Sequence, residues 1–414
     1  MTGPRMRWTP RRLRYCLQID PAAPAALRSE PDLPVTFLPM EAVGEDGSLD
    51  LTREISVGKA LSGYTFLADG DVLLAKVTPC FENGKGAIAA GLTNGYGFAT
   101  TEVYSLRPSA GINPRFLDYL LRSTVFRQYG SARLTGAGGL KRVSATDIRN
   151  FSSPVPPLDE QRAIADFLDR ETARIDTLIE EQQRLIELLH ERRSSALAQC
   201  TTSGDPIPLG RVLTHIRQGS SPTCEPWPAD GIDEWAVLKV GCSNTGRFQA
   251  LENKRLPDTT APQPENAVLN GEIVMSRSNT KELVGCASVV DRPYPRLLLS
   301  DLTYGLGVGD LADNRYVAYS LASSHCRHAI ASMAKGSSPS MQKISQRDVR
   351  EIPLYLPSIV DQRRIVTYLD DRISKIDTLI AETEKFIDLS RERRSALITA
   401  AVTGQIDVRE KVAE

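Results

Sequence analysis

Polar side chains gather in two short stretches of this chain, each beginning at the end of a segment expected to form a buried strand. The first set follows residues 71–75 and comprises Lys76, Thr78, Asn83 and Lys85. The second set follows residues 271–276 and comprises Arg277, Ser278, Asn279, Thr280 and Lys281. Arginine, lysine and asparagine are side chains that contact base edges and phosphates in nucleic-acid complexes. Because loops at strand ends often carry binding residues, both sets are candidate DNA contacts.

Two further pairs of polar residues follow the glycine-rich loops of the chain. After the loop Thr135–Gly139 come Lys141 and Arg142. After the loop Gly336–Ser340 come Gln342 and Lys343. Taken singly, each of these residues is more often an ordinary solvated loop residue than a ligand contact. The hypothesis of a ligand contact rests on their occurrence as matched sets in both halves of the chain.

The spacing of a known catalytic site is not found in the sequence. There is no GxxxxGK[ST] phosphate loop, and no Asn/Asp-Pro-Pro-aromatic string of the kind that amino-methyltransferases use to hold a base. The string Glu252-Asn253-Lys254, preceded by Asp230 and Asp233, matches a nuclease motif only at the level expected by chance. His325 and His328 lie on an expected helix without a third ligand, which favours packing over metal binding. We expect no catalytic residues, no metal site and no cofactor on this chain.

The elements that position these residues occur twice, because the chain contains an internal repeat. Gln161 corresponds to Gln362, an offset of 362 − 161 = 201 residues, and half of the twenty positions in 161–180 are identical to those in 362–381. The same offset aligns 140–151 with 341–352, and 70–75 with 271–276. So much identity indicates a duplication. The stretches 17–63 and 218–264 do not align, which predicts a repeated scaffold with different loops.

The best-matched part of the repeat predicts a helix of nearly 40 residues in each half. Its apolar stripe in the first half consists of Ile164, Leu168, Ile175, Leu178, Leu185 and Leu189. The corresponding stripe in the second half consists of Ile365, Leu369, Ile376, Leu379 and Phe386. This spacing is typical of a coiled coil, so we expect the two helices to pack antiparallel and relate the two halves by a pseudo-twofold axis. Alternatively, each helix packs only on its own domain, although a length of roughly 60 Å is large for that role.

The length and composition of the chain limit the number of domains and the possible cellular location. The 414 residues predict two or three domains, and the formal net charge of −1 means that no global field draws the chain to nucleic acid. The seven cysteines contain no CxxC pair, which predicts reduced thiols and a cytoplasmic location. No apolar run is long enough to cross a membrane, and the N-terminus lacks the apolar core of a signal peptide.

The domain boundaries follow from the repeat and from the prolines that precede each long helix. We expect one domain over residues 1–157, a helix over 158–204, a second domain over 205–357, a second helix over 358–403 and a tail over 404–414. Both domains should be mixed α/β. Strands are expected at 71–77, 87–90, 102–106 and 271–276, and single helices at 115–129 and 315–331.

The start of each long helix carries a family motif. A proline precedes an acidic-Gln-Arg-x-Ile run, formed in the first helix by Pro156, Glu160, Gln161, Arg162 and Ile164. In the second helix the motif is formed by Pro357, Asp361, Gln362, Arg363 and Ile365. Both helices continue to an E-R-R-S string, and the tail reads VTGQID at 402–407. This double occurrence resembles the specificity (S) subunit of type I restriction-modification systems over essentially the whole chain.

The resemblance implies two target recognition domains, each of which would read one half of a split double-stranded DNA sequence. The helices would set the gap between the halves and present a docking surface for two modification (methyltransferase) subunits. The residues assigned to these spacer and docking helices are Gln161, Ile164, Leu168, Ile175 and Leu178, and their counterparts Gln362, Ile365, Leu369, Ile376 and Leu379. S-adenosylmethionine would bind to those partner subunits, separate restriction (motor-nuclease) subunits would cleave, and the S subunit would be non-catalytic. Two other classes stay open: a stand-alone methyltransferase or nuclease, and a coiled-coil adaptor that does not bind DNA.

Overall fold

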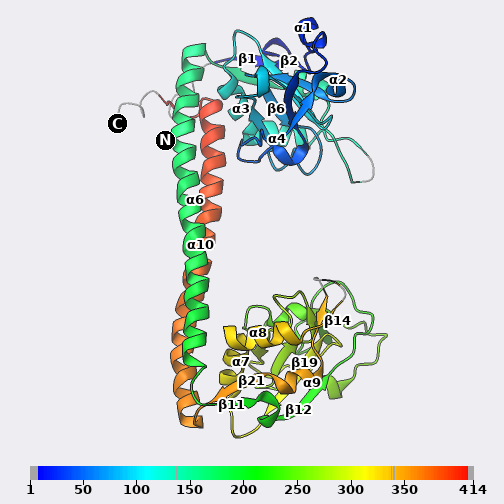
Figure 1. Ribbon diagram of the computed structural model, residues 1–414, viewed down its shortest axis with the longest axis vertical. Coiled ribbons are helices and arrows are strands. Elements are labelled where there is room, and N and C mark those ends of the chain that lie inside the picture. The colour runs from blue at the N-terminus through cyan, green and yellow to red at the C-terminus, as the bar shows by residue number, and fades with distance from the viewer. Residues whose placement is uncertain (1–7, 137–138, 337, 339–340, 409–414) are drawn as a thin grey trace. The chain divides into compact units, whose positions relative to one another are not determined.

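The computed structural model describes residues 8–136, 139–336, 338 and 341–408. Parts of both expected glycine-rich loops, 137–138, 337 and 339–340, lie outside the described residues, as do 1–7 of the expected first domain and 409–414 of the expected tail. The chain forms two compact units, Met1–Gln182 with Glu384–Glu414, and Gln183–Thr383. These units differ from the expected division because each long helix, α6 (Leu158–Cys200) or α10 (Ile359–Val402), contributes to both of them (Figure 1).

One four-stranded antiparallel sheet occurs in each unit with the same strand order. In the first unit the order is β2 (Leu17–Ile19), β9 (Val103–Pro108), β6 (Val72–Ala75) and β7 (Gly86–Ile88). In the second unit it is β12 (Leu213–Gln218), β19 (Thr303–Val308), β15 (Ile273–Ser276) and β17 (Ala287–Val289). All four residues of β6 and of β15 are buried. These sheets confirm the strands expected at 71–77, 87–90, 102–106 and 271–276, with slightly different ends.

A second sheet combines strands from the regions that do not align in sequence with strands from outside those regions. Its order in the first unit is β4 (Glu54–Ser56), β3 (Pro34–Leu38), β8 (Tyr96–Ala99) and β5 (Thr65–Ala68). In the second unit it is β14 (Asn253–Arg255), β13 (Ala236–Leu238) and β18 (Leu297–Leu298). The central pairs β3–β8 and β13–β18 are both parallel. The two units therefore share topology where their sequences have diverged, because short strands fix backbone pairing and leave most side chains free to vary.

The single helices expected at 115–129 and 315–331 are each two helices, so that prediction was wrong. The first pair is α3 (Pro114–Arg122) and α4 (Thr124–Ser131), and the second pair is α7 (Asn314–Ala322) and α8 (Ser324–Met333). The breaks fall at Ser123 and Ser323, whose backbones are extended. The Ser123 hydroxyl accepts a hydrogen bond from the amide of Phe126. Serine in this position caps a new helix instead of continuing the old one.

Smaller elements complete both units. Strand pairs at the domain edges are β1 (Thr9–Arg12) with β10 (Ser152–Val155), and β11 (Asp205–Pro208) with β21 (Pro353–Leu356). Short α-helices are α1 (Ala25–Arg28), α2 (Val57–Ala60), α5 (Ala145–Asn150) and α9 (Gln346–Glu351). Short 3-10 helices lie at Leu13–Tyr15, Met40–Ala42, Thr93–Gly95, Leu209–Arg211, Val240–Ser243 and Pro264–Asn266.

The two long helices pack against each other in antiparallel directions within each unit. In the first unit, residues from the start of α6 and the end of α10 share one core cluster, which includes Ile164, Phe167, Leu168, Ile398, Ala401 and Val402. In the second unit, residues from the end of α6 and the start of α10 share another cluster, which includes Ala196, Leu197, Leu369 and Ile373. Ion pairs accompany both contacts, Asp176–Arg394 at 2.9 Å and Arg193–Asp377 at 3.5 Å. The expected antiparallel pairing is confirmed.

The residues that form the seam between the helices were predicted only in part. Ile164, Leu168, Ile175, Leu189, Leu369 and Ile376 are buried as expected, and Ile365 is partly buried. Leu178, Leu185, Leu379 and Phe386 are instead 39%, 40%, 48% and 45% exposed, so their assignment to the seam was wrong. In all four places the next residue is an isoleucine, and it lies further inside the protein. When neighbouring residues are both apolar, a heptad pattern cannot tell which of them faces the partner helix.

The end of α10 and the residues after it belong to the core of the first unit. Val408 lies in the same buried cluster as Leu13 and Phe116 of the first domain. Gly404 has a left-handed backbone, with φ of 70°, and turns the chain against the ring of Trp8. The core of the first unit is therefore built from two segments that are far apart in the sequence.

Candidate nucleic-acid interface

The structure brings the two sets of candidate residues together in both units. In the first unit, the amide of Thr78 donates to the carbonyl of Lys141 at 2.9 Å, and the amide of Lys141 donates to the Thr78 hydroxyl at 3.0 Å. Val77 forms an antiparallel bridge with Arg142. In the second unit, β16 (Ser278–Asn279) pairs antiparallel with β20 (Gln342–Lys343). The offset of 201 maps the Val77–Arg142 bridge onto Ser278–Lys343, so both domains build the same two-loop surface.

Cationic residues surround a buried tyrosine in this surface of the first unit. The Lys76 ammonium lies 4.3 Å from the centre of the Tyr104 ring, and the Tyr104 hydroxyl donates to the carbonyl of Val143 at 3.1 Å. Burial lowers the pKa of Lys76, the Asp20 carboxylate opposes that shift, and the Arg142 guanidinium adds to it. Lys141 and Arg142 are exposed. Lys76 is therefore a half-buried cation held in place, and it lies beside the exposed cationic side chains of Lys141 and Arg142.

The second unit repeats this frame with different side chains. The Tyr304 hydroxyl donates to the carbonyl of Ile344 at 3.1 Å, and burial raises the pKa of Tyr304. The Arg277 guanidinium donates to the carbonyl of Asp301 at 3.0 Å. Lys281 and Lys343 are exposed. Arg277 is thus held by a backbone carbonyl, while Lys281 and Lys343 face solvent.

Four other candidates of the second unit are held by contacts within the protein. The Asn279 side chain donates to Asn244 at 3.0 Å, and the Gln342 side chain donates to the carbonyl of Ser338 at 2.7 Å. The Thr280 amide donates to the Asn279 side chain at 2.9 Å. Ser278 is only 3% exposed, and its hydroxyl donates to the sulfur of Met341 at 3.3 Å. Its side chain lies inside the protein, although a solvent-facing contact was expected there.

Asn83 and Lys85 lie apart from this group and contact a different segment of the first domain. The Asn83 side chain donates to the Glu45 carboxylate at 2.9 Å, and the Lys85 ammonium donates to the carbonyl of Met40 at 3.4 Å. Both are therefore anchored to residues 40–45, and the paired loops do not include them.

Buried ion pairs stiffen the sheet behind the paired loops, and the sequence patterns did not reveal them. Asp71 is 1% exposed and accepts two hydrogen bonds from Arg107 of β9, at 2.8 and 2.7 Å. At the equivalent position, Glu272 is 4% exposed and accepts two from Arg217 of β12, at 3.0 and 2.6 Å. The available signal was an acidic residue at the start of an otherwise apolar strand, since a buried charge requires a partner.

Gln161 and Gln362 anchor the long helices to their own domains. Gln161 is fully buried, accepts a hydrogen bond from the Asn113 amide at 2.7 Å, and donates to the carbonyls of Gly111 and Pro156 at 3.1 and 2.8 Å. Gln362 repeats all three contacts, with Asp313, Leu311 and Pro357 at 2.8, 3.2 and 2.9 Å. Both glutamines therefore belong to the spacer helices as expected, but their own domains cover them, so they are not available for docking. Sequence spacing placed them on the helix but could not show that the face they occupy is covered.

A second anchor holds α3 and α7 against the long helices. In the first unit, Arg115 contacts Asp166 at 2.6 Å and Asp169 at 2.5 Å, and the Tyr119 hydroxyl donates to Asp169 at 2.7 Å. In the second unit, Arg315 contacts Asp370 at 2.7 Å, and the Tyr319 hydroxyl donates to the same carboxylate at 2.6 Å. Burial raises the pKa of Tyr319 to about 12.

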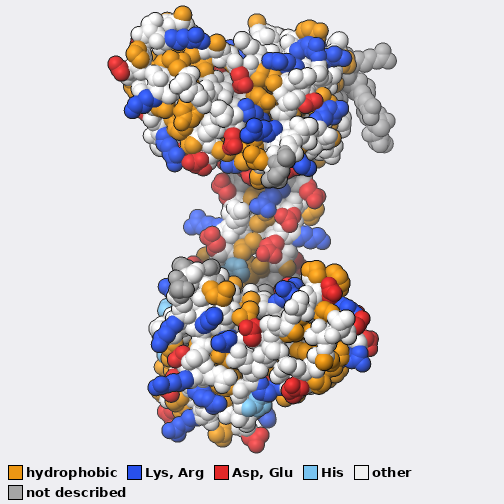
Figure 2. All heavy atoms as spheres, turned by 90° about the vertical axis from the view of Figure 1, so that its right-hand side faces the viewer, with side chains coloured by type: hydrophobic (Ala, Val, Ile, Leu, Met, Phe, Trp, Pro, Cys, Tyr) orange, Lys and Arg blue, Asp and Glu red, His pale blue; other side chains and the backbone are white. Residues whose placement is uncertain are grey.

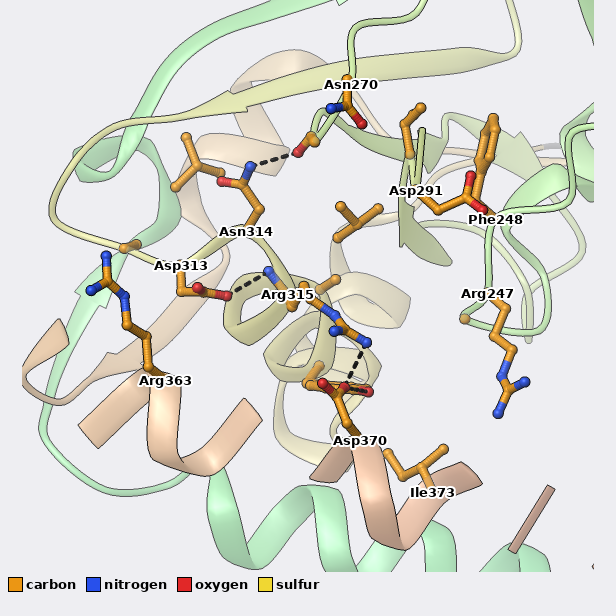
Figure 3. A pocket seen from close by; sticks show the side chains of 18 of the residues that line it. Arg247, Phe248, Asn270, Asp291, Asp313, Asn314, Arg315, Arg363, Asp370 and Ile373 are labelled. Atoms are coloured by element: carbon orange, nitrogen blue, oxygen red, sulfur yellow. Dashed lines mark hydrogen bonds and ion pairs between the residues drawn. The ribbon is translucent and has the colours of Figure 1, made fainter. Parts of the chain in front are cut away.

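A wide cavity of about 1200 Å³ opens beside this anchor in the second unit. Figure 3 shows Arg315 reaching from α7 towards Asp370 of α10, while Arg247, Phe248 and Asp291 lie across the opening on other loops. Its lining mixes side chains of both charge signs. Small-molecule sites are usually apolar and narrow, so this cavity has the character of a solvent-filled groove.

The motif-like residues considered for catalysis have structural roles. The Asp230 carboxylate accepts hydrogen bonds from the amides of Ile232, Asp233 and Glu234, at 2.9, 3.0 and 3.2 Å, and so caps a turn. The ring of His325 packs against the ring of Tyr355, with centroids 5.1 Å apart. Within the described part of the chain, no group of three or more His, Cys, Asp or Glu residues could hold a metal ion.

The surface charges of both domains are mixed. Figure 2 shows lysine and arginine side chains interspersed with acidic and apolar ones on the face in view. Fold and surface together define a class: a protein with two α/β domains on one repeated frame, each with its own set of polar loops, joined by paired antiparallel helices.

Comparisons with known proteins show which proteins of this class the chain is similar to. A family model described as the type I restriction modification DNA specificity domain matches residues 65–188. The EcoEI specificity subunit of Escherichia coli is 26% identical over 89% of this chain and 78% of its own length. A solved structure from work on the assembly and conformational transition of the type I R-M system has a TM-score of 0.77, 18% identity, and covers 98% of this chain and 100% of its own. The HsdS subunit from Thermoanaerobacter tengcongensis has a TM-score of 0.55, 19% identity, and covers 96% of this chain and 97% of its own.

Residues 65–188 therefore match a type I restriction modification DNA specificity domain, and the chain as a whole is similar to specificity subunits of type I restriction enzymes. The function named by that match is DNA specificity. The two other classes left open by the sequence, a stand-alone modifying enzyme and an adaptor without DNA binding, are not supported.

Proposed function

We propose that each domain binds one half of a bipartite DNA target through its paired loops. The observation that carries this proposal is the duplicated pairing of Val77 with Arg142 and of Ser278 with Lys343. The backbone frame is the same in both domains, but the side chains on it differ, as two readers of different sequences require. Phosphate contacts by Lys141, Arg142, Lys281 and Lys343 would position the DNA, and neighbouring polar groups would contact base edges.

The paired helices are proposed to set the distance between the two half-sites. Each helix exceeds 40 residues, and each is anchored to its own domain by a buried glutamine. A stiff connection accepts only half-sites at a matching distance and rotational phase, as in dimeric repressors.

The outward face of the helices is proposed to dock two modification subunits. Leu178, Leu185 and Leu188 of α6 are 39%, 40% and 54% exposed. At an offset of 201 residues, Leu379, Phe386 and Leu389 of α10 are 48%, 45% and 54% exposed. Exposed apolar side chains on otherwise polar helices mark interaction sites, and the repeat supplies two equivalent copies for two subunits.

The remaining assignments concern the complex. S-adenosylmethionine is proposed to bind to the modification subunits, and restriction subunits to join the same assembly. The seven cysteines are unpaired, which supports a cytoplasmic location. Among the residues that the structure describes, no helix is long and apolar enough to cross a bilayer.

The proposal is tested by replacing residues 206–350 with the equivalent domain of a relative, in a complex with the modification subunits. Methylome sequencing should then show one half of the methylated sequence changed and the other half retained. The reciprocal exchange of the first domain is the matched control, and it should change the other half. A change in both halves, or in neither, would contradict the assignment of one half-site to each domain.

A further inference from the structure

A large apolar side chain is exposed at the same repeat position in both domains. Leu140 is 43% exposed and Met341 is 54% exposed, and they are related by the offset of 201. Each lies on a loop that we call the tip loop, which comprises the described residues 135–136 and 139–142 in the first unit and 335–336, 338 and 341–343 in the second. Cationic side chains follow them directly in the first loop, Lys141 and Arg142, and close by in the second, Lys343.

Both tip loops are closed at their base by a reciprocal pair of backbone hydrogen bonds. In the first unit, Thr135 and Arg142 exchange bonds of 3.0 and 2.8 Å. In the second unit, Lys335 and Lys343 exchange two bonds of 2.9 Å. The residue that carries the exposed apolar side chain is thus held near the end of a short antiparallel ribbon.

A glycine supports the apolar residue in each tip loop by close backbone contact. A Cβ atom at Gly136 would lie 2.4 Å from the carbonyl oxygen of Leu140, and one at Gly336 would lie 2.3 Å from that of Met341. A larger residue would push the loop apart in either case. The same close approach to the backbone of the apolar residue therefore occurs in both tip loops.

The setting of these side chains fits DNA better than a protein partner. A protein interface needs an extended patch of apolar surface, whereas each tip loop presents one apolar residue among cations. Proteins that deform DNA insert single apolar side chains, including leucine and methionine, between neighbouring bases while cations hold the flanking phosphates. The tip loop carries both components within a few residues.

We propose that Leu140 and Met341 are apolar wedges, each of which inserts at one base step of the half-site bound by its own domain. The wedge would unstack that step, and the adjacent cations would hold the backbone on either side. This inference rests on the proposed DNA-binding role of the paired loops and adds a deformation of the DNA to it. The sequence of the half-site would then be read partly through how easily the step opens.

The test uses the full chain in complex with its modification subunits and a duplex carrying the sequence that the complex methylates. A fluorescent adenine analogue, 2-aminopurine, is placed at one position of the duplex at a time, because its emission rises when it loses its stacking neighbour. The methylated adenines are left out of the scan, because methyltransferases flip their target base out of the stack without any wedge. Wild-type protein should brighten one position in each half-site. Leu140→Ala should abolish the signal in the first domain's half-site alone and weaken binding on the order of tenfold. Met341→Ala should do the same in the other half-site.

Matched variants separate insertion from general damage to the protein. Leu61→Ala and Leu251→Ala remove side chains that are 37% and 66% exposed outside the tip loops, and both should leave brightening and affinity unchanged. Leu140→Met and Met341→Leu should restore the signals, since either side chain can act as a wedge. A wild-type complex that binds and methylates its target without brightening any position would overturn the wedge, as would signals that survive both alanine substitutions. A wild-type complex without sequence-specific binding would instead overturn the proposed function, and the wedge with it.

Discussion

Replacement of Gln161 by alanine is expected to loosen the first domain from its helix. The change removes the side-chain contacts to the Asn113 amide, the Gly111 carbonyl and the Pro156 carbonyl. Pro156 is buried, so its carbonyl would lose a partner that water cannot replace, whereas Gly111 is exposed and water can reach it. Counting about 1 kcal/mol each for the bonds to Asn113 and Pro156, nothing for the bond to Gly111 that water replaces, and about 1 kcal/mol for the buried carbonyl left without a partner gives roughly 3 kcal/mol.

This loss should be visible in the melting of the first unit. For a folded unit of about 200 residues, 1 kcal/mol corresponds to about 2–4 °C, so the Tm should fall by about 6–12 °C. Scanning calorimetry measures the shift, and hydrogen exchange locates it, because the Asn113 amide should exchange faster. Gln362→Ala should give the same changes in the second unit, at the amide of Asp313.

A matched control is available on the same helix. Gln183 is exposed, so Gln183→Ala should change stability by no more than about 0.5 kcal/mol. If Gln161→Ala lowered the Tm by less than about 2 °C, and exchange at Asn113 stayed at the wild-type rate, then the buried contacts would not be what fixes the domain on its helix.

Three further predictions concern spacing, charge and docking. Inserting seven residues after Gln182 and seven after Thr383 adds a heptad, about 10.5 Å, to both helices. Methylome sequencing should then show a gap longer by about three base pairs, and an unchanged gap would refute the spacing role. Burial raises the pKa of the Asp20 carboxyl, so its charged form is unfavourable in the folded protein at neutral pH, and this cost disappears as the pH falls through that raised pKa. Asp20→Asn should therefore raise the Tm at pH 7 but not below about pH 4, and it should strengthen DNA binding at low salt; equal Tm values at pH 7 would contradict this. Leu188→Asp and Leu389→Asp should each reduce the modification subunits bound in native mass spectrometry from two to one, and full occupancy in both variants would remove these leucines from the docking surface.

Sequence reasoning identified the elements that repetition makes visible. The duplication, the two long helices and their antiparallel pairing follow from matches such as Gln161 with Gln362. The sequence determined the seam between the two helices less well. Leu178 and Ile179 both fit the heptad spacing, and only the packing shows which of them is covered. The break between α3 and α4 at Ser123 was not predicted for a similar reason, because a serine can either continue a helix or cap the next one.

The candidate site was predicted as separate pieces, and its assembly could not be read from the sequence. Thr78 and Lys141 meet because two loops far apart in the chain pair through their backbones, which leaves no side-chain pattern. The buried acids Asp71 and Glu272 are equivalent, but their arginine partners come from different strands. After the duplication, the two halves came to use arginines at different positions. An alignment of the halves therefore matches Asp71 with Glu272 but does not match their arginine partners.

The discontinuous core of the first unit constrains the order in which the protein can form. Ile398, Val402 and Val408 complete that core, and the ribosome adds them to the chain only after it has synthesised the whole of residues 183–383. The second unit is contiguous and can close as soon as it is synthesised, whereas the first must wait with an open apolar face. Nascent chains that stop short of this segment should thus be substrates for chaperones even though their first 182 residues are all present.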